Sequence, residues 1–87
     1  MICRKITYRG TFDELAAAQM YDITRKNEIN GEVKVISPQE IQLNLEGDPS
    51  FIKLIQLQIE HSLSDKISNK DVTKLSYQQY SGINFIR

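Results

Sequence analysis

Cysteine is nearly absent from this 87-residue sequence, where Cys3 is the only one, so no disulfide can form within the chain. A lone thiol is typical of a reducing compartment, and we expect a cytoplasmic protein, either a whole chain or one domain of a longer one. No apolar run approaches the roughly 20 residues of a membrane span. The first residues also lack the apolar region of a signal peptide. We therefore expect no membrane partner.

An excess of charge of either sign is also absent, because 11 lysines and arginines balance 11 aspartates and glutamates. Affinity for a nucleic-acid backbone depends on clustered basic side chains, so we expect no nucleic-acid partner. Repeats and low-complexity tracts are missing as well. The length then predicts a single domain over residues 1–87.

Histidine occurs once, and no second histidine or cysteine stands near it at the spacing of metal ligands. We interpret His61 as a surface residue near the C-terminal end of a helix, where a positive charge is favourable. We interpret Cys3 as a small apolar strand residue rather than a nucleophile. The sequence therefore predicts no metal site and no cofactor.

What the sequence does contain is regular hydrophobic periodicity. Alternation of apolar and polar residues predicts strands over 2–9, 31–36 and 40–46, the last two joined by a Ser-Pro-Gln turn. Helical spacing predicts helices over 12–28 and 49–63. A polar connection is expected over 64–71, followed by a strand at Val72–Tyr77 and an extended tail at Ile83–Arg87.

Capping residues mark both helix starts. Thr11 with Glu14 matches a capping box for the first helix, and Asp48 before Pro49 suits the start of the second. Asn30 and Gly31 are expected to end the first helix. The buried stripes are predicted to be Phe12, Leu15, Ala16, Met20 and Ile23 on the first helix, and Phe51, Leu54, Ile55, Ile59 and Leu63 on the second.

The element order β-α-β-β-α-β predicts an α+β fold, a ferredoxin-like two-layer sandwich. We expect an antiparallel four-stranded sheet with two helices on one face. The other face should be solvated, because one parity of the strands is polar: Lys5, Thr7, Glu32, Lys34, Gln42 and Asn44.

Several short motifs occur in the order and spacing of one known family. They are Gly10 after the first strand, Gly31-Glu32-Val33-Lys34, Glu46-Gly47 before the second helix, and Asn84-Phe85-Ile86-Arg87 at the end. Together they span essentially the whole chain, which resembles the acylphosphatase family. The resemblance implies the fold described above and hydrolysis of acyl phosphates without a cofactor.

The catalytic residues of that family have no counterpart here. The family's phosphate-binding arginine aligns with Ala17 or Ala18, and its water-positioning asparagine aligns with Val35. Thr11 and Glu14 are placed to satisfy the helix N–H groups that would bind a phosphate, and acidic side chains in the first turn oppose an anion. The resemblance therefore implies no catalytic residue.

Three functions remain open from the sequence. The first is a non-catalytic binding module for a protein or small molecule, with Arg9, Gly10 and Thr11 as candidate binding residues. The second is an active acylphosphatase that uses displaced groups such as Arg9. The third is a homo-oligomer formed through the edge strands of the sheet.

Overall fold

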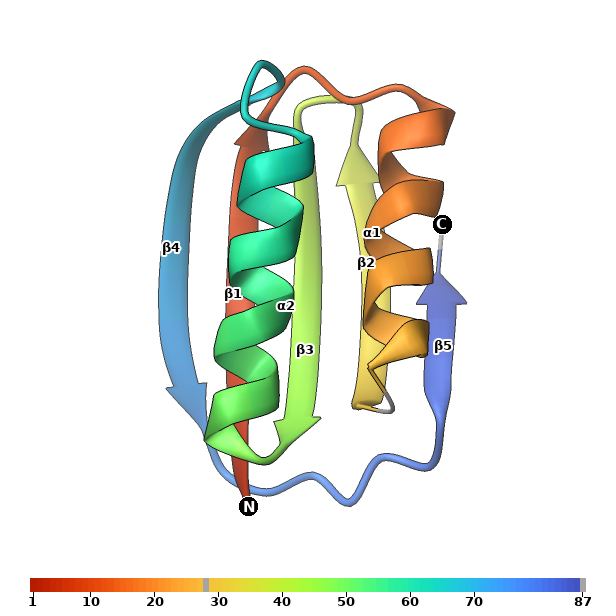
Figure 1. Ribbon diagram of the computed structural model, residues 1–87. Coiled ribbons are helices and arrows are strands. Elements are labelled where there is room, and N and C mark those ends of the chain that lie inside the picture. The colour runs from red at the N-terminus through yellow and green to blue at the C-terminus, as the bar shows by residue number, and fades with distance from the viewer. Residues whose placement is uncertain (28, 87) are drawn as a thin grey trace.

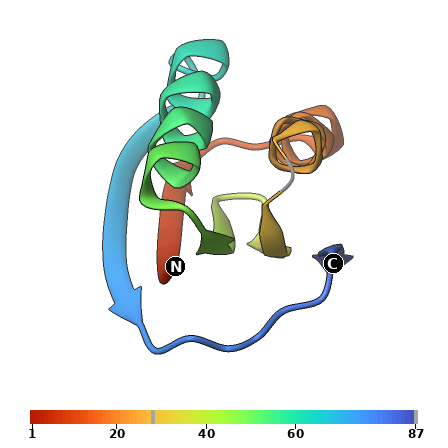
Figure 2. The same cartoon turned by 60° about the horizontal axis from the view of Figure 1, so that its bottom comes forward.

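One sheet with two helices on one face makes up the computed structural model, which describes residues 1–27 and 29–86 (Figure 1). The elements in chain order are β1 (Ile2–Gly10), α1 (Glu14–Lys26), β2 (Asn30–Ser37), β3 (Glu40–Gly47), α2 (Pro49–Ser62), β4 (Ile67–Leu75) and β5 (Ile83–Ile86). The strand order is β4-β1-β3-β2-β5. Both helices lie on the same side of this sheet (Figure 2).

The α+β expectation is confirmed, but the expectation of four antiparallel strands is wrong. The tail forms a fifth strand, β5, which pairs parallel to β2 from Gly31↔Ile83 to Lys34↔Ile86. The ring of Phe85 packs beside that of Tyr21 on α1, with centroids 5.3 Å apart. Contacts between these distant segments hold β5 beside β2. Four residues are too few to show the alternation of apolar and polar residues that identifies a strand. Arg87, the end of the predicted tail, lies outside the described residues.

The predicted polar connection over residues 64–71 is also wrong, because β4 already begins at Ile67. β4 is an edge strand, and residues 68–74 are all exposed. Apart from Val72 these exposed residues are polar on both faces, so the alternation that identifies a half-buried strand is missing.

The start of α1 differs from the prediction, whereas that of α2 agrees with it. Asp13, not Thr11, caps α1: its carboxylate accepts a hydrogen bond from Ala16 N at 2.8 Å. The Asp48 carboxylate accepts from Ser50 N at 2.8 Å, as expected of the cap of α2. α1 ends at Lys26, and Gly31 lies inside β2 instead of ending the helix. Glu28, at the predicted helix end, lies outside the described residues.

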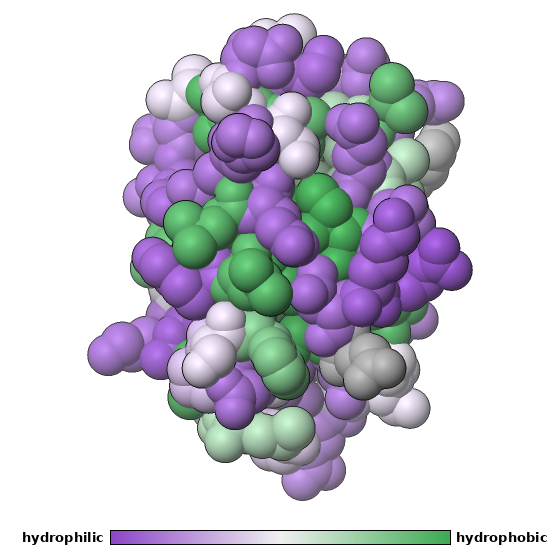
Figure 3. All heavy atoms as spheres, in the orientation of Figure 1, coloured by the Kyte–Doolittle hydropathy of each residue, from purple (hydrophilic) through white to green (hydrophobic). Residues whose placement is uncertain are grey.

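The core lies between the helices and the sheet. α1 buries Ala16, Ala17 and Met20, and α2 buries Ile52, Ile55 and Ile59, against Ile6, Tyr8, Val33, Ile41, Leu43 and Leu45 of the sheet. Leu15, Phe51 and Leu54 are exposed instead of buried, since each lies beside the stripe that meets the sheet. Apolar patches accordingly interrupt the hydrophilic surface of the helix face (Figure 3). No helix within the described ranges is long and apolar enough to cross a membrane.

Candidate functional site

A pocket of about 190 Å³ lies between the start of α1 and the β2–β3 hairpin. Its apolar lining comes from Phe12, Ala17, Val35, Pro38 and Ile41, and its polar lining from Asp13, Glu14 and Ser37. These lining residues include two carboxylates and no lysine, arginine or histidine. The pocket is therefore an apolar hollow with an acidic rim.

The walls of the pocket are held by contacts between distant segments. Phe12 is buried, and its backbone N–H donates to Pro38 O at 2.8 Å, which joins the β1–α1 connection to the hairpin. Val35 and Ile41 face each other across the β2–β3 pair and lie on the sheet side of the pocket. On the opposite side Ala17 contributes only a methyl group, which leaves the space open.

Four backbone donors around the start of α1 are already engaged. Gly10 N donates to Gln39 O at 3.0 Å, and Thr11 N donates to Lys66 O at 3.0 Å. Phe12 N and Ala16 N are bonded to Pro38 O and to the Asp13 carboxylate, as described above. An anion at a helix start is bound by free N–H groups. These four groups bind other parts of the chain instead.

The structure brings together two positions that the family resemblance singled out. Ala17 and Val35, which align with the family's arginine and asparagine, both line the pocket. Ala18, the alternative position for the arginine, is exposed and lies outside the lining. These two positions therefore lie in one pocket, and neither carries a charge.

The candidate binding residues lie beside the pocket rather than among its lining residues. The guanidinium of Arg9 is 2.6 Å from Asp71 Oδ2 and 3.4 Å from Glu40 Oε1. The hydrogen bond to Asp71, together with these carboxylates, raises the pKa of Arg9. Gly10 and Thr11 have their N–H groups engaged by the hairpin and by the α2–β4 connection. A binding role for these three residues stays a prediction.

Sequence reasoning missed Pro38 and Ile41 as pocket residues and assigned Phe12 only to a helix stripe. The Ser-Pro-Gln turn was the available signal, because it places the hairpin tip at one end of the sheet. That this end meets the start of α1 depends on the Phe12–Pro38 hydrogen bond, which no local pattern reveals.

A cluster of three polar side chains, Tyr8, Glu60 and Lys70, lies outside the lining of the pocket. The Tyr8 hydroxyl donates to Glu60 Oε2 at 2.9 Å, and Lys70 Nζ donates to Glu60 Oε1 at 2.7 Å. Burial raises the pKa of Tyr8, and the Glu60 carboxylate raises it further. This group links β1, α2 and β4.

The remaining candidates have ordinary surroundings. Cys3 is buried in β1, and burial raises the pKa of its thiol. A raised pKa makes a thiol less reactive at neutral pH. His61 is exposed in the last turn of α2. Within residues 1–27 and 29–86, no three His, Cys, Asp or Glu side chains come together as a metal site.

Comparison with known proteins gives similarity of structure without similarity of sequence. No family model matches the chain. No protein of curated function matches it in sequence either. Among solved structures, an acylphosphatase from Bacillus subtilis is similar at a TM-score of 0.83 and 14% identity, with 100% of both chains covered.

Two further structures extend the comparison. An acylphosphatase from Coxiella burnetii matches at a TM-score of 0.81 and 16% identity, covering 97% of this chain and 90% of the other. Full-length HypF, in a phosphate- and nucleotide-bound form, matches at 0.80 and 15% identity, covering 99% of this chain and 12% of HypF. The chain therefore has the acylphosphatase-like fold.

Proposed function

We propose that this chain is a non-catalytic acylphosphatase-like module that binds a small molecule through an apolar group. The observation that carries the proposal is the lining of the pocket between α1 and the hairpin. Five apolar residues surround the space, and both charged residues at its rim are acidic. Ligand sites of this kind are mostly apolar, with few polar groups that set orientation.

Electrostatics favours an uncharged or cationic ligand over a phosphate. A helix N-terminus carries about half a positive charge, which two carboxylates outweigh. Asp13 and Glu14 place these carboxylates at the pocket rim. Four backbone donors near them, those of Gly10, Thr11, Phe12 and Ala16, are bonded within the chain. A phosphate would meet repulsion without an opposing cation in the lining.

The alternative is an acylphosphatase with displaced catalytic groups, for which Arg9 is the nearest candidate. Its guanidinium binds Asp71 and Glu40, so it would have to leave two carboxylates to reach a substrate. The same experiments separate this alternative from the binding module.

Hydrolysis of benzoyl phosphate is the first test. We expect turnover at the rate of the uncatalysed reaction, with the Bacillus subtilis acylphosphatase as positive control. Turnover above that rate, lost on Arg9→Ala, would replace the proposal with the displaced-group enzyme.

Binding is tested by NMR titration of the amide spectrum with benzyl alcohol and with inorganic phosphate. We expect saturable shifts at Phe12, Ala17 and Val35 with benzyl alcohol and none with phosphate. Ala17→Leu fills the pocket and should abolish the shifts, whereas Ala18→Leu adds the same group at an exposed position and should preserve them. Saturable phosphate shifts at residues 10–18 would contradict the proposal.

A further inference from the structure

The segment between β4 and β5, residues 76–82, crosses the face of the sheet that the helices leave uncovered (Figure 2). We call this segment the strap. It has no helix or strand, and all of its residues are exposed except Tyr80, which is partly buried. Burial of apolar surface therefore contributes little to holding it against the sheet.

One carboxylate binds three consecutive backbone groups of the strap. Glu46 in β3 is only 2% exposed, and its oxygens accept three consecutive backbone N–H groups of the strap. The bonds run from Gln78 N at 2.6 Å and Gln79 N at 3.1 Å to Oε2, and from Tyr80 N at 2.7 Å to Oε1. Consecutive N–H groups that converge on one anion form a main-chain nest, and hydrogen bonds to a charged group are the strong kind.

The backbone of the strap is bent to make these bonds. Gln79 has φ of 59°, a left-handed conformation that is uncommon for any residue other than glycine. Such a conformation costs free energy and persists when surrounding contacts enforce it. Here the bonds to Glu46 on either side of Gln79 supply that enforcement. The strap ends at Gly82, whose carbonyl accepts from Gly31 N at 2.8 Å where β5 begins.

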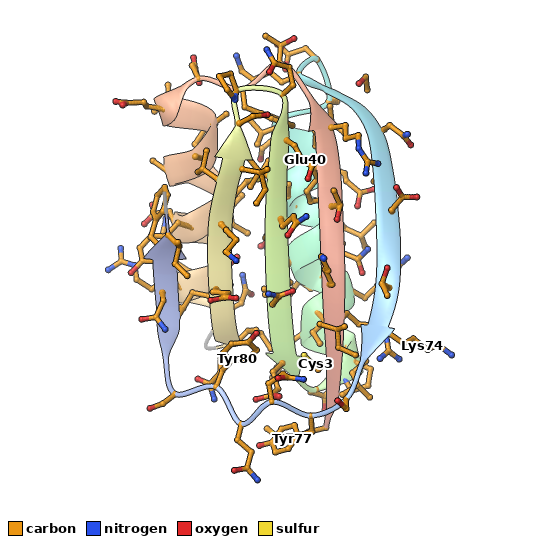
Figure 4. All side chains as sticks on the ribbon, turned by 180° about the vertical axis from the view of Figure 1, so that it is seen from behind. Cys3, Glu40, Lys74, Tyr77 and Tyr80 are labelled. Atoms are coloured by element: carbon orange, nitrogen blue, oxygen red, sulfur yellow. The ribbon has the colours of Figure 1, made fainter. Side chains whose placement is uncertain are left out.

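The thiol of the chain lies at the end of the sheet where the strap crosses. Cys3 lies directly opposite Glu46 in the antiparallel β1–β3 pair, so both side chains project from the same face. Cys3 is 1% exposed, and it lies with Tyr80 at the end of the sheet that the strap crosses (Figure 4). The Cys3 thiol and the strap therefore lie at the same end of the face that the helices leave uncovered.

We infer that the strap is a hinged cover, that Glu46 is its latch, and that it opens while the rest of the sheet stays folded. Opening breaks the three bonds to the Glu46 carboxylate, together with the side-chain contacts of Tyr80 with Asn44 and of Tyr77 with Met1, and it relaxes Gln79. The core between helices and sheet stays intact. In the open state Cys3 and the Glu46 carboxylate face solvent. This inference is independent of the ligand proposed for the pocket.

The test is the rate at which iodoacetamide alkylates Cys3 under native conditions. We expect Glu46→Gln and Glu46→Ala to raise the rate by about 10- to 100-fold, because the charge-assisted bonds are lost. Glu40→Gln is the matched control, since Glu40 is a carboxylate of the same strand and face that binds Arg9 rather than the strap. We expect its rate to stay within twofold of wild type.

Global unfolding is separated from strap opening by hydrogen exchange of the wild-type protein. The amides of residues 78–80 should exchange through an opening of lower free energy than the amides of β1 and β3. The free energy of opening calculated from Cys3 alkylation should match that of residues 78–80. Equal alkylation of Glu46→Ala and wild type would overturn the inference. So would exchange of the strap amides only together with the central strands.

Discussion

At the scale of single residues, Gly10 shows how a sequence motif can have a structural cause. A Cβ atom there would lie 1.9 Å from Lys66 O, the carbonyl just before β4. The absence of a side chain is thus required by the close approach of two backbones, whether or not Gly10 also binds a ligand.

Gly10→Ala should therefore destabilise the protein by more than about 2 kcal/mol, because backbone must move to admit the methyl group. Gly82→Ala is the control: its φ is +72° but no atom lies within 4 Å of its Cβ, so we expect only the conformational cost of about 1 kcal/mol. Urea unfolding of both variants measures the difference. Equal losses would show that the backbones near Gly10 separate easily.

Tyr8 carries a pH dependence. Burial and the Glu60 carboxylate raise its pKa in the folded protein above the value of about 10 in an unfolded chain. Folding thus favours the neutral phenol. This contribution to stability is complete below about pH 10 and is lost progressively as the pH rises above 10.

Tyr8→Phe should lower the free energy of unfolding by about 1 kcal/mol at pH 7, since the bond to Glu60 is lost. Above pH 10 the variant should lose stability less steeply than wild type. Urea unfolding at a series of pH values from 7 to 11 checks this. The same curve for Tyr8→Phe and wild type would contradict the assignment.

At the scale of elements, the start of α1 distinguishes two caps that look equally good in sequence. Asp13→Ala should destabilise the protein by about 1 kcal/mol, because the bond to Ala16 N is lost. Thr11→Ala should change stability by no more than about 0.5 kcal/mol, since the side chain is exposed. Thermal unfolding of the two variants decides, and the reverse order would restore Thr11 as the cap.

Thr11 and Asp13 are both residue types that cap helices. Contacts with segments outside α1 determine which of them is the cap. The N–H of Thr11 binds Lys66 O and that of Phe12 binds Pro38 O, which holds these residues in an extended connection. The helix can begin only after them. In α2 the Asp48 carboxylate binds Ser50 N, and the predicted cap at Asp48 is correct.

At the scale of the whole molecule, the exposed edge of β4 bears on self-association. Two copies of the chain could pair antiparallel through β4. In the two alignments centred near the middle of the strand, like charges would lie opposite each other. A pair centred on Asp71 opposes the two copies of that residue, and one centred on Val72 opposes Lys70 to Lys74. Like charges directly opposite destabilise strand pairing, and charged residues are a common protection of edges.

We therefore expect a monomer in light scattering at concentrations up to the millimolar range. The double variant Lys70→Thr, Lys74→Thr removes the repulsion from the register centred on Val72 and should associate more readily. Glu14→Thr, Lys53→Thr, which changes charge on the helices, is the control and should remain monomeric. A wild-type dimer disrupted by proline at Val72 would support the edge-strand oligomer instead.

Part of the candidate site could be predicted from the sequence, and part could not. The family spacing of the flanking motifs aligned Ala17 and Val35 with the family's arginine and asparagine, and both residues line the pocket. The pocket itself could not be predicted, since its shape depends on the hairpin tip meeting the α1 start through Phe12 and Pro38. The position of Arg9 was likewise decided by Asp71, a residue of the misassigned strand β4.

By itself the sequence determined the order of helices and strands through Leu63, the α+β class and the apolar character of the Ala17 and Val35 positions. Periodicity and capping report these features because they act between residues near in the chain. The tertiary structure alone decided the fifth strand, the early start of β4, the cap of α1, the pocket and the strap held by Glu46. Each of these arises where distant segments satisfy one another's backbone groups, as Tyr80 N does with Glu46, and a local pattern carries no record of such a pairing.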